Sequence, residues 1–196
     1  MVEMSKKKST YQKLLESASE CFSEKGFSAT SIREIATRAG ISQGAMYTYF
    51  KSKEELFIAI VEEEQRIALG IYSENYEGSD TDRLYDMIFK ACLSENPLYP
   101  EIHNPLWLEI MAESSRNETL RQYFIYSDIV LREGIHKFLV HGMQTGEFRG
   151  DLELNEVTMV IFAMIDGLMG RKAINPAFVI EKDIPGFKKL LKAMLS

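Results

Sequence analysis

Apolar residues recur every three or four positions along nearly the whole chain, which is the pattern of amphipathic α-helices. The pattern predicts one helix running from Lys53 through "EELFIAIVEEEQRIALGIY" and others over about 81–93, 118–145 and 155–171, with a last one from Ile184 onward. The run "LWLEIMAESS" adds a further helix after the proline-bearing loop "ENPLYPEIHNP". No segment alternates apolar and polar residues as a half-buried strand does. We therefore expect an all-α protein.

Helix starts and stops are unusually dense near the amino end, beginning at Ser31. Ser31 is a suitable N-cap, and Glu34 three residues later completes a capping box. Ile35 and Ala36 then fall on one apolar face, and Gly40 supplies a left-handed stop. This stretch predicts a short amphipathic helix that ends in a tight turn.

A second, even shorter helix follows that turn. Ser42 is its N-cap, and Ile41 and Met46 have the spacing of a hydrophobic staple. Ser52 opens the next helix with another capping box, so the helix between the caps spans only about 7 residues, from Gln43 to Tyr49. So short a helix is unstable alone, and packing must hold it.

Two short helices joined by a tight turn containing glycine form a helix-turn-helix, whose second helix can enter a DNA major groove. Met46 and Phe50, four residues apart, define the inward edge of the second helix. The residues that cannot share this edge offer hydroxyls, an amide and bare backbone for phosphates and base edges, and they are Gln43, Gly44, Tyr47, Thr48 and Tyr49. Helix-turn-helix geometry also occurs as plain packing, so the shape alone leaves both readings open.

The run "TSIREIATRAGISQGAMYTYFKSKEELF" resembles the DNA-binding domain of TetR/AcrR-family transcriptional regulators, and the preceding "CFSEKGFSATS" is also typical of them. The strings around Trp107 and Gly167 look like the C-terminal domains of the BetI-like branch. The resemblance implies an all-helical homodimer that binds a palindromic operator and releases it when a small ligand occupies the C-terminal domain. We expect a helix-turn-helix DNA-binding domain over residues 1–53, with the motif at about 31–50, and a helical effector-binding and dimerisation domain over 54–196.

The expected DNA contacts follow from this motif. Gln43 can form paired hydrogen bonds with adenine, and Gly44 permits close approach of the backbone. The resemblance implies that Tyr47, Tyr49 and Lys53 contact phosphates, with help from the helix N-termini at the two capping serines. The candidate DNA-binding residues are Thr30, Ser31, Ser42, Gln43, Gly44, Tyr47, Thr48, Tyr49 and Lys53.

The charge distribution agrees with a DNA-facing end. The chain carries 23 Lys and Arg against 29 Asp and Glu, a net charge of −6. Residues 1–53 hold nine of the basic and five of the acidic residues, a balance of +4, so the remainder carries 14 − 24 = −10. A basic end and an acidic body, which phosphates repel, suit a DNA-binding protein. The alternative for Lys6 to Lys8 is a solvated lysine-rich terminus.

The stretch "EVTMVIFAMIDGLMGRKA" is apolar on nearly all sides, so it predicts a helix buried on more than one side. The resemblance implies that this helix pairs with the long preceding helix and with their copies in a second subunit. The candidate interface residues are Met159, Phe162, Gly167 and Gly170. The alternative is a central core helix with no partner.

An effector site is expected near the stretch "NPLWLEIMAE", where an aromatic and apolar stripe lies beside acidic residues. The candidates are Trp107, Glu109, Ile110, Met111 and Asp166. This composition suits a small molecule with an apolar body and a cationic group. The alternative is that the apolar residues are core and the carboxylates face solvent or cap neighbouring helices.

Several classes of protein find no support. No apolar run reaches the roughly 18 residues of a transmembrane helix, and "MVEMSKKKST" lacks the apolar segment of a signal peptide, so we expect a cytoplasmic protein that does not bind membranes. We expect both cysteines, Cys21 and Cys92, to be inert core residues. The three histidines lack metal-ligand spacing and no nucleophile or phosphate-loop motif occurs, so neither an enzyme, a metal site nor a cofactor is expected. Two alternatives to a ligand-responsive repressor remain, which are a constitutive DNA-binding regulator and a helical adaptor without DNA binding.

Overall fold

The computed structural model describes residues 9–73, 78–92 and 103–196, and within them it contains ten α-helices and no β-strand. The helices are α1 (Thr10–Lys25), α2 (Ile32–Arg38), α3 (Gln43–Met46), α4 (Lys53–Ser73), α5 (Asp80–Cys92), α6 (His103–Arg116), α7 (Glu118–Thr145), α8 (Leu154–Ile174), α9 (Ile180–Asp183) and α10 (Phe187–Leu195). The all-α architecture expected from the hydrophobic period is confirmed.

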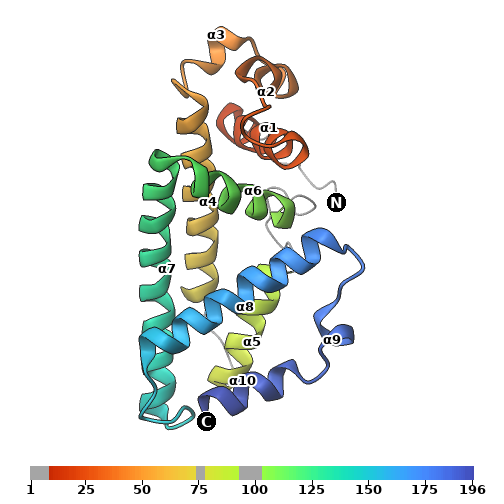
Figure 1. Ribbon diagram of the computed structural model, residues 1–196. Coiled ribbons are helices and arrows are strands. Elements are labelled where there is room, and N and C mark those ends of the chain that lie inside the picture. Colours follow the sequence, from red (N-terminus) through yellow and green to blue (C-terminus); the bar gives the residue numbers. More distant parts are fainter. Residues whose placement is uncertain (1–8, 74–77, 93–102) are drawn as a thin grey trace, which may run out of the picture.

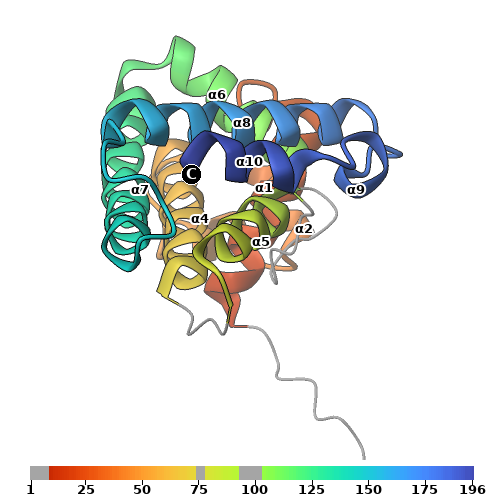
Figure 2. The same ribbon diagram turned by 90° about the horizontal axis from the view of Figure 1, so that it is seen from below.

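The helices form a small head and a larger body (Figure 1). The head consists of α1 to α3, with α3 at its tip, and α4 runs from the head down into the body beside α7. Helix α6 lies across the molecule between α1 and α8, and α8 crosses the body diagonally. Helix α10 lies at the end of the molecule opposite α3 (Figure 1), and the view from below shows it beside α5 (Figure 2). The tip of α3 is therefore free of the body.

Two helices begin or end differently from the sequence expectation. Helix α3 ends at Met46 instead of Tyr49, because the following amides of Thr48 and Tyr49 bond to carbonyls three residues back, at Ala45 and Met46, as in a 3₁₀ turn. The helix expected from Ile184 begins three residues later, as α10 at Phe187 after Pro185 and Gly186, and the short α9 before Ile184 was not expected. Proline lacks the amide that would continue the helix from α9. The loop "ENPLYPEIHNP" lies largely outside the described residues.

The first hydrophobic core is not confined to the head. It joins Leu14, Phe22 and Ile35 to Phe57 and Ile60 of α4. It also includes three fully buried or nearly buried residues of the body, which are Leu106 and Ile110 of α6 and Leu120 of α7. The core therefore crosses the boundary at residues 53 and 54 where the two domains were expected to meet.

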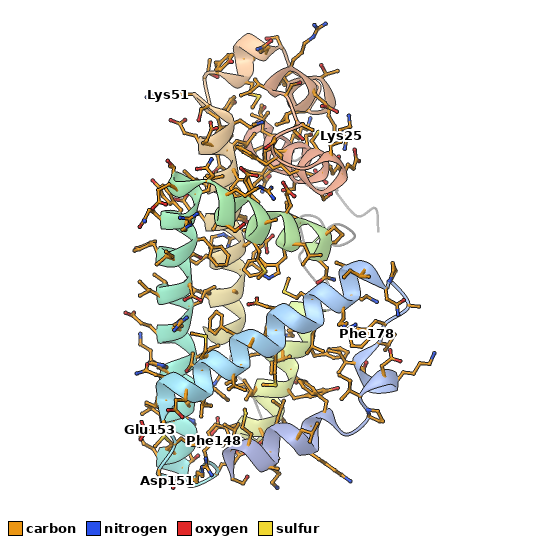
Figure 3. All side chains as sticks on the ribbon, in the orientation of Figure 1. Lys25, Lys51, Phe148, Asp151, Glu153 and Phe178 are labelled. Carbon is orange, nitrogen blue, oxygen red and sulfur yellow. The ribbon has the colours of Figure 1, made fainter. Side chains whose placement is uncertain are left out.

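The second core fills the body and is closed at its base by a turn after α7. Gly146 ends α7 with a φ of 78°, and the chain folds back so that the amide of Phe148 donates to the carbonyl of Gly142 at 3.0 Å. A β-carbon at Gly142 would lie 2.2 Å from the Phe148 ring, so glycine is required there. Phe148 lies at the base of the body beside α7 (Figure 3). Glu147 of the same turn accepts the amides of Asp80 and Thr81 and so caps α5.

Candidate DNA-binding interface and effector site

The caps expected from the sequence hold α2 and α3 in place. Ser31 Oγ accepts the amide of Glu34 at 3.2 Å, and Ser42 Oγ accepts the amide of Ala45 at 3.1 Å. Gly40 between the helices has a φ of 72°, the left-handed conformation that ends α2. Met46 is fully buried in the first core. The short recognition helix is thus held by a cap at one end and a buried anchor at the other.

The opposite side of α3 is open to solvent. We call the exposed residues Gln43, Gly44, Tyr47, Thr48 and Tyr49 the recognition face. The two tyrosines are 48% and 47% exposed, so their hydroxyls are accessible from outside. A β-carbon on Gly44 would meet only Ser42 Oγ, at 4.0 Å, so the backbone of α3 can be approached closely from outside. The structure brings these predicted residues together on one surface.

Ser42 directly precedes that surface and Ser31 caps α2, and both serines are exposed. Their hydroxyl oxygens accept the capping amides, so each O–H remains able to donate to a phosphate oxygen. Thr30 differs, because it is only 2% exposed and its Oγ1 donates to the carbonyls of Cys21 at 3.1 Å and Gly26 at 2.8 Å. Its side chain fastens the α1–α2 loop (residues 26–31) from inside, so we remove Thr30 from the proposed side-chain contacts to DNA.

The ammonium of Lys53 is bound within the protein. Lys53 Nζ donates to the carbonyls of Phe27 at 2.6 Å and Thr30 at 2.9 Å, and it lies 4.3 Å from the centroid of the Phe27 ring. These contacts link the first turn of α4 to the α1–α2 loop. Lys53 therefore has a structural role, because it binds the α1–α2 loop without DNA. The phosphate contact expected from the sequence stays a prediction.

Other cations of the head differ in how they are paired. Arg38 bonds Glu24 at 2.7 Å and Glu20 at 3.2 Å, which lowers the pKa of the Glu24 carboxyl, and Lys25 pairs with Glu34. Arg33 on α2 is exposed and forms no ion pair with the described residues.

Arg33 lines an open groove of about 430 Å³ on the outer surface of α2. The groove is bordered by Ser31, Arg33, Glu34, Thr37 and Arg38. Sequence reasoning missed Arg33 as a candidate contact. Its position two residues after the N-cap, outside the apolar face of α2, was the available signal.

Trp107 and Asp166, two of the expected effector residues, do meet in the body. Trp107 Nε1 donates to Asp166 Oδ1 at 3.1 Å, and the indole lies 5.7 Å from the Phe124 ring. Burial raises the pKa of the Asp166 carboxyl, and the charge of Asp128 raises it further, while the hydrogen bond from Trp107 lowers it. The pair joins α6 to α8 by a half-buried aromatic ring and a partly desolvated acid. Met111 is also half-buried.

Glu109 and Ile110, by contrast, face the head. Glu109 Oε1 accepts the amide of Phe27 at 2.6 Å. Ile110 is fully buried in the first core, with the residues of α1 and α4. The run "NPLWLEIMAE" therefore contains residues that contact different neighbours of α6. We do not retain Glu109 and Ile110 in the proposed effector site.

The expected dimer residues also divide between two surfaces. Met159 is 47% exposed on α8, and a β-carbon at Gly167 would meet no atom within 4 Å, so both face outward. Phe162 is half-buried beneath the guanidinium of Arg132, 5.8 Å away. Gly170 faces inward, because its β-carbon would lie 3.6 Å from Leu108 of α6. Gly170 allows close packing of α8 against α6 within the subunit.

Further large apolar side chains are exposed on α8 and on α7. Val160 follows Met159 and is 46% exposed, while Tyr126 and Ile129 of α7 are 64% and 51% exposed. Apolar residues gathered on an outer face typically mark a contact with another protein.

The cysteines and the possible metal ligands are the other candidate sites. Cys21 is fully buried, and burial raises the pKa of its thiol, which disfavours a reactive thiolate. The side chain of Cys92 is outside the described part of the chain. Among the described residues, no group of three potential ligands could hold a metal ion, and no helix is long and apolar enough to cross a membrane.

Comparison with known proteins agrees with this geometry. Residues 14–60 match the model of the bacterial regulatory proteins of the tetR family, and residues 82–183 match that of the C-terminal domain of BetI-type transcriptional repressors. The chain belongs to the TetR family. This TetR-family chain is a DNA-binding transcriptional regulator, and the resemblance noted from the sequence, including its BetI-like part, is confirmed.

Individual relatives extend along most of the chain. The transcriptional repressor AcnR of Corynebacterium diphtheriae is 25% identical over 166 residues, which cover 83% of this chain and 80% of AcnR. The structure of Salmonella enterica GusR is 26% identical, covers 98% of this chain and 96% of its own, and superposes with a TM-score of 0.79. FadR from Bacillus subtilis, in complex with stearoyl-CoA, shares the fold at 22% identity and a TM-score of 0.79, covering 95% of this chain and all of FadR.

Proposed function

We propose that this TetR-family regulator is a repressor that binds a palindromic operator as a homodimer and releases it when a small molecule occupies the body. The observation that carries the proposal is the recognition face, where two tyrosines, an amide and an unobstructed glycine backbone are exposed beside a buried Met46 anchor. A surface of this composition suits the major groove because it offers donors to phosphates and an amide to base edges.

The roles within this surface differ. Gln43 lies at the exposed start of α3, where its amide is suited to the paired hydrogen bonds that identify adenine. Tyr47 and Tyr49 directly follow α3 and suit contacts to phosphates, with Ser31 and Ser42 donating from the helix N-termini. Arg33, exposed in the groove on α2, adds a cation. Lys53 joins these contacts only if its ammonium leaves the α1–α2 loop.

The test begins with selection of bound sequences from random duplexes, followed by affinity measurements on the selected site. Gln43→Ala should relax sequence preference at one or two positions, by roughly 1–3 kcal/mol each. Arg33→Ala should weaken all sequences alike and reduce the slope of affinity against salt by about one. Lys192→Ala removes an exposed cation from α10, at the opposite end of the molecule, and is the matched control. Failure to bind any duplex in a salt-dependent manner would leave the helical adaptor as the remaining reading.

A homodimer is supported by the exposed apolar residues of α7 and α8, which are Tyr126, Ile129, Met159 and Val160. A two-fold interface uses the same surface on both subunits, so these residues would bury one another in pairs. Two recognition helices related by a two-fold axis read a palindrome. We therefore expect selected duplexes to contain inverted half-sites about one helical turn apart.

Control by an effector requires that the ligand bind the form released from DNA more tightly than the bound form. Trp107 and Asp166 suit a ligand with an apolar body and a cationic group, because the indole offers a π face and the partly desolvated Asp166 carboxyl, which accepts the indole N–H, forms no ion pair among the described residues. The FadR structure is of a complex with stearoyl-CoA, so long acyl chains belong in the same screen. A true effector should raise Tm and lower operator affinity together. If no metabolite does so, the protein is a constitutive regulator instead.

A further inference from the structure

Glu109 of α6 lies directly against the backbone of the head. Its Oε1 accepts the amide of Phe27 at 2.6 Å, a short distance typical of a charged acceptor. Gly26, just before this amide, has a φ of 82°, and a β-carbon there would lie 3.3 Å from the same oxygen. The carboxylate therefore occupies space that a side chain at position 26 would crowd.

The other side of this loop is held by α4. The carbonyl of Phe27, the residue whose amide bonds Glu109, accepts Lys53 Nζ at 2.6 Å. The Phe27 ring is buried between Phe22 and Phe57, with centroids 5.4 and 5.2 Å away. A carboxylate from the body and an ammonium next to the recognition helix thus bind successive polar groups of one residue.

This contact differs in kind from the apolar packing around it. Leu106, Ile110 and Leu120 bury apolar surface against the head, but such contacts are non-directional and tolerate small displacements. A hydrogen bond weakens steeply when its length or angle changes. Glu109 therefore fixes the orientation of the head on α6 more narrowly than the packing can.

Glu109 is also two residues from Trp107, on the same helix. Trp107 bonds α8, and Glu109 bonds the α1–α2 loop, so a shift of α6 relative to either neighbour must strain one of these hydrogen bonds. Arg116 Nη2 lies 3.9 Å from Glu109 Oε1 and offers a second partner of opposite charge. A carboxylate released from Phe27 would consequently keep a charge partner.

We propose that Glu109 is a positioning residue: its hydrogen bond to Phe27 sets the orientation of the recognition face relative to the body, and displacement of α6 breaks that bond. The inference rests on the proposed function, because orientation matters only if two recognition faces must match two half-sites. It assigns to Glu109 the coupling between body and head, in place of the ligand contact expected from the sequence.

The test compares Glu109→Ala with Glu109→Gln in the full-length protein. The alanine variant should lose at least about tenfold in affinity for the selected full site and less than about threefold for a duplex carrying one half-site. A head that was merely damaged would lose affinity for both duplexes alike. Glu109→Gln keeps an acceptor oxygen and should restore most of the full-site preference. Glu181→Gln removes an exposed charge from α9, away from the head, and should leave the ratio of the two affinities unchanged.

Hydrogen exchange followed by mass spectrometry gives a readout that needs no DNA. Glu109→Ala should speed exchange in the peptide covering residues 26–30, while peptides from α10 keep their protection. An alanine variant with unchanged exchange in that peptide, or with full-site and half-site affinities falling in parallel, would overturn the proposal. If the unmodified protein bound no duplex, the proposed function would fail, and the exchange result would still decide whether Glu109 holds the loop.

Discussion

Lys53 gives the sharpest test of how the head is assembled, because the sequence predicts that it contacts phosphates and the structure shows that it binds the α1–α2 loop. Lys53→Met removes the ammonium and keeps an apolar stem of similar length. The substitution deletes hydrogen bonds of 2.6 and 2.9 Å to the carbonyls of Phe27 and Thr30, together with the cation above the Phe27 ring. All of these contacts exist without DNA, so stability should fall even when no DNA is present.

The expected size follows from the contacts. A hydrogen bond to a charged group contributes about 1.5–3 kcal/mol. The site is only partly buried and the freed carbonyls can bind water, so we take about 2 kcal/mol for the whole set. For a chain of this length that corresponds to a fall in Tm of about 4–8 °C.

The assay is thermal unfolding followed by circular dichroism, at one fixed protein concentration. Lys51→Met is the matched control, because Lys51 is exposed beside the start of α4 (Figure 3) and its Tm should stay within about 2 °C of the unmodified protein. If Lys53→Met kept its Tm but bound the operator poorly, the loop contacts would be unimportant in solution. Lys53 would then act mainly on phosphates, as the sequence motif predicts.

Three other substitutions test separate surfaces. Gly44→Ala should leave Tm equal or higher, since alanine favours helix over glycine by up to about 1 kcal/mol. If DNA approaches this backbone closely, the same substitution should weaken operator binding about tenfold. Equal affinities of the two proteins in a fluorescence titration would refute close approach. Gly167→Arg should convert a dimer to a monomer in sedimentation at micromolar concentration, and a monomeric unmodified protein would contradict the interface. Asp166→Asn should be more stable than the unmodified protein at neutral pH, and this advantage should shrink toward pH 4. Burial raises the pKa of the Asp166 carboxyl, so the folded protein binds this proton more tightly than the unfolded chain does. The stability of the unmodified protein therefore falls as pH rises through the folded-state pKa. A constant difference across that pH range, measured by urea unfolding, would contradict this reasoning.

Local signals in the sequence predicted the head well. The serine caps at Ser31 and Ser42 and the left-handed Gly40 depend on neighbours within a few residues and are formed as expected, whereas the Glu34 carboxylate pairs with Lys25. The end of α3 was harder, because the change from α to 3₁₀ hydrogen bonds after Met46 involves little energy and no distinctive residue. Short-range chemistry thus predicted where the motif lies but not its last turn.

Contacts between distant segments could not be read from the same signals. Helical periodicity shows that residues share a face, but it does not say which helix that face meets. Trp107 and Glu109 are close in sequence, yet one bonds α8 and the other bonds the α1–α2 loop. Gly170, a candidate for contact between subunits, also lies against Leu108 of α6 within the subunit. These assignments required the packing of α6 between the head and α8.

The first core has a consequence for how such proteins exchange their parts. Leu106, Ile110 and Leu120 belong to the same cluster as the apolar residues of α1 and α4. A chimera joined at residue 53, with a foreign head on this body, would place unmatched side chains against those three residues and create cavities or overlaps. Transfer of DNA specificity should succeed more readily when only the recognition face is exchanged. It should also succeed when the head is transferred together with the α6 residues that contact it. Recombination between relatives at the apparent domain boundary is therefore expected to yield poorly folded hybrids more often than the sequence pattern suggests.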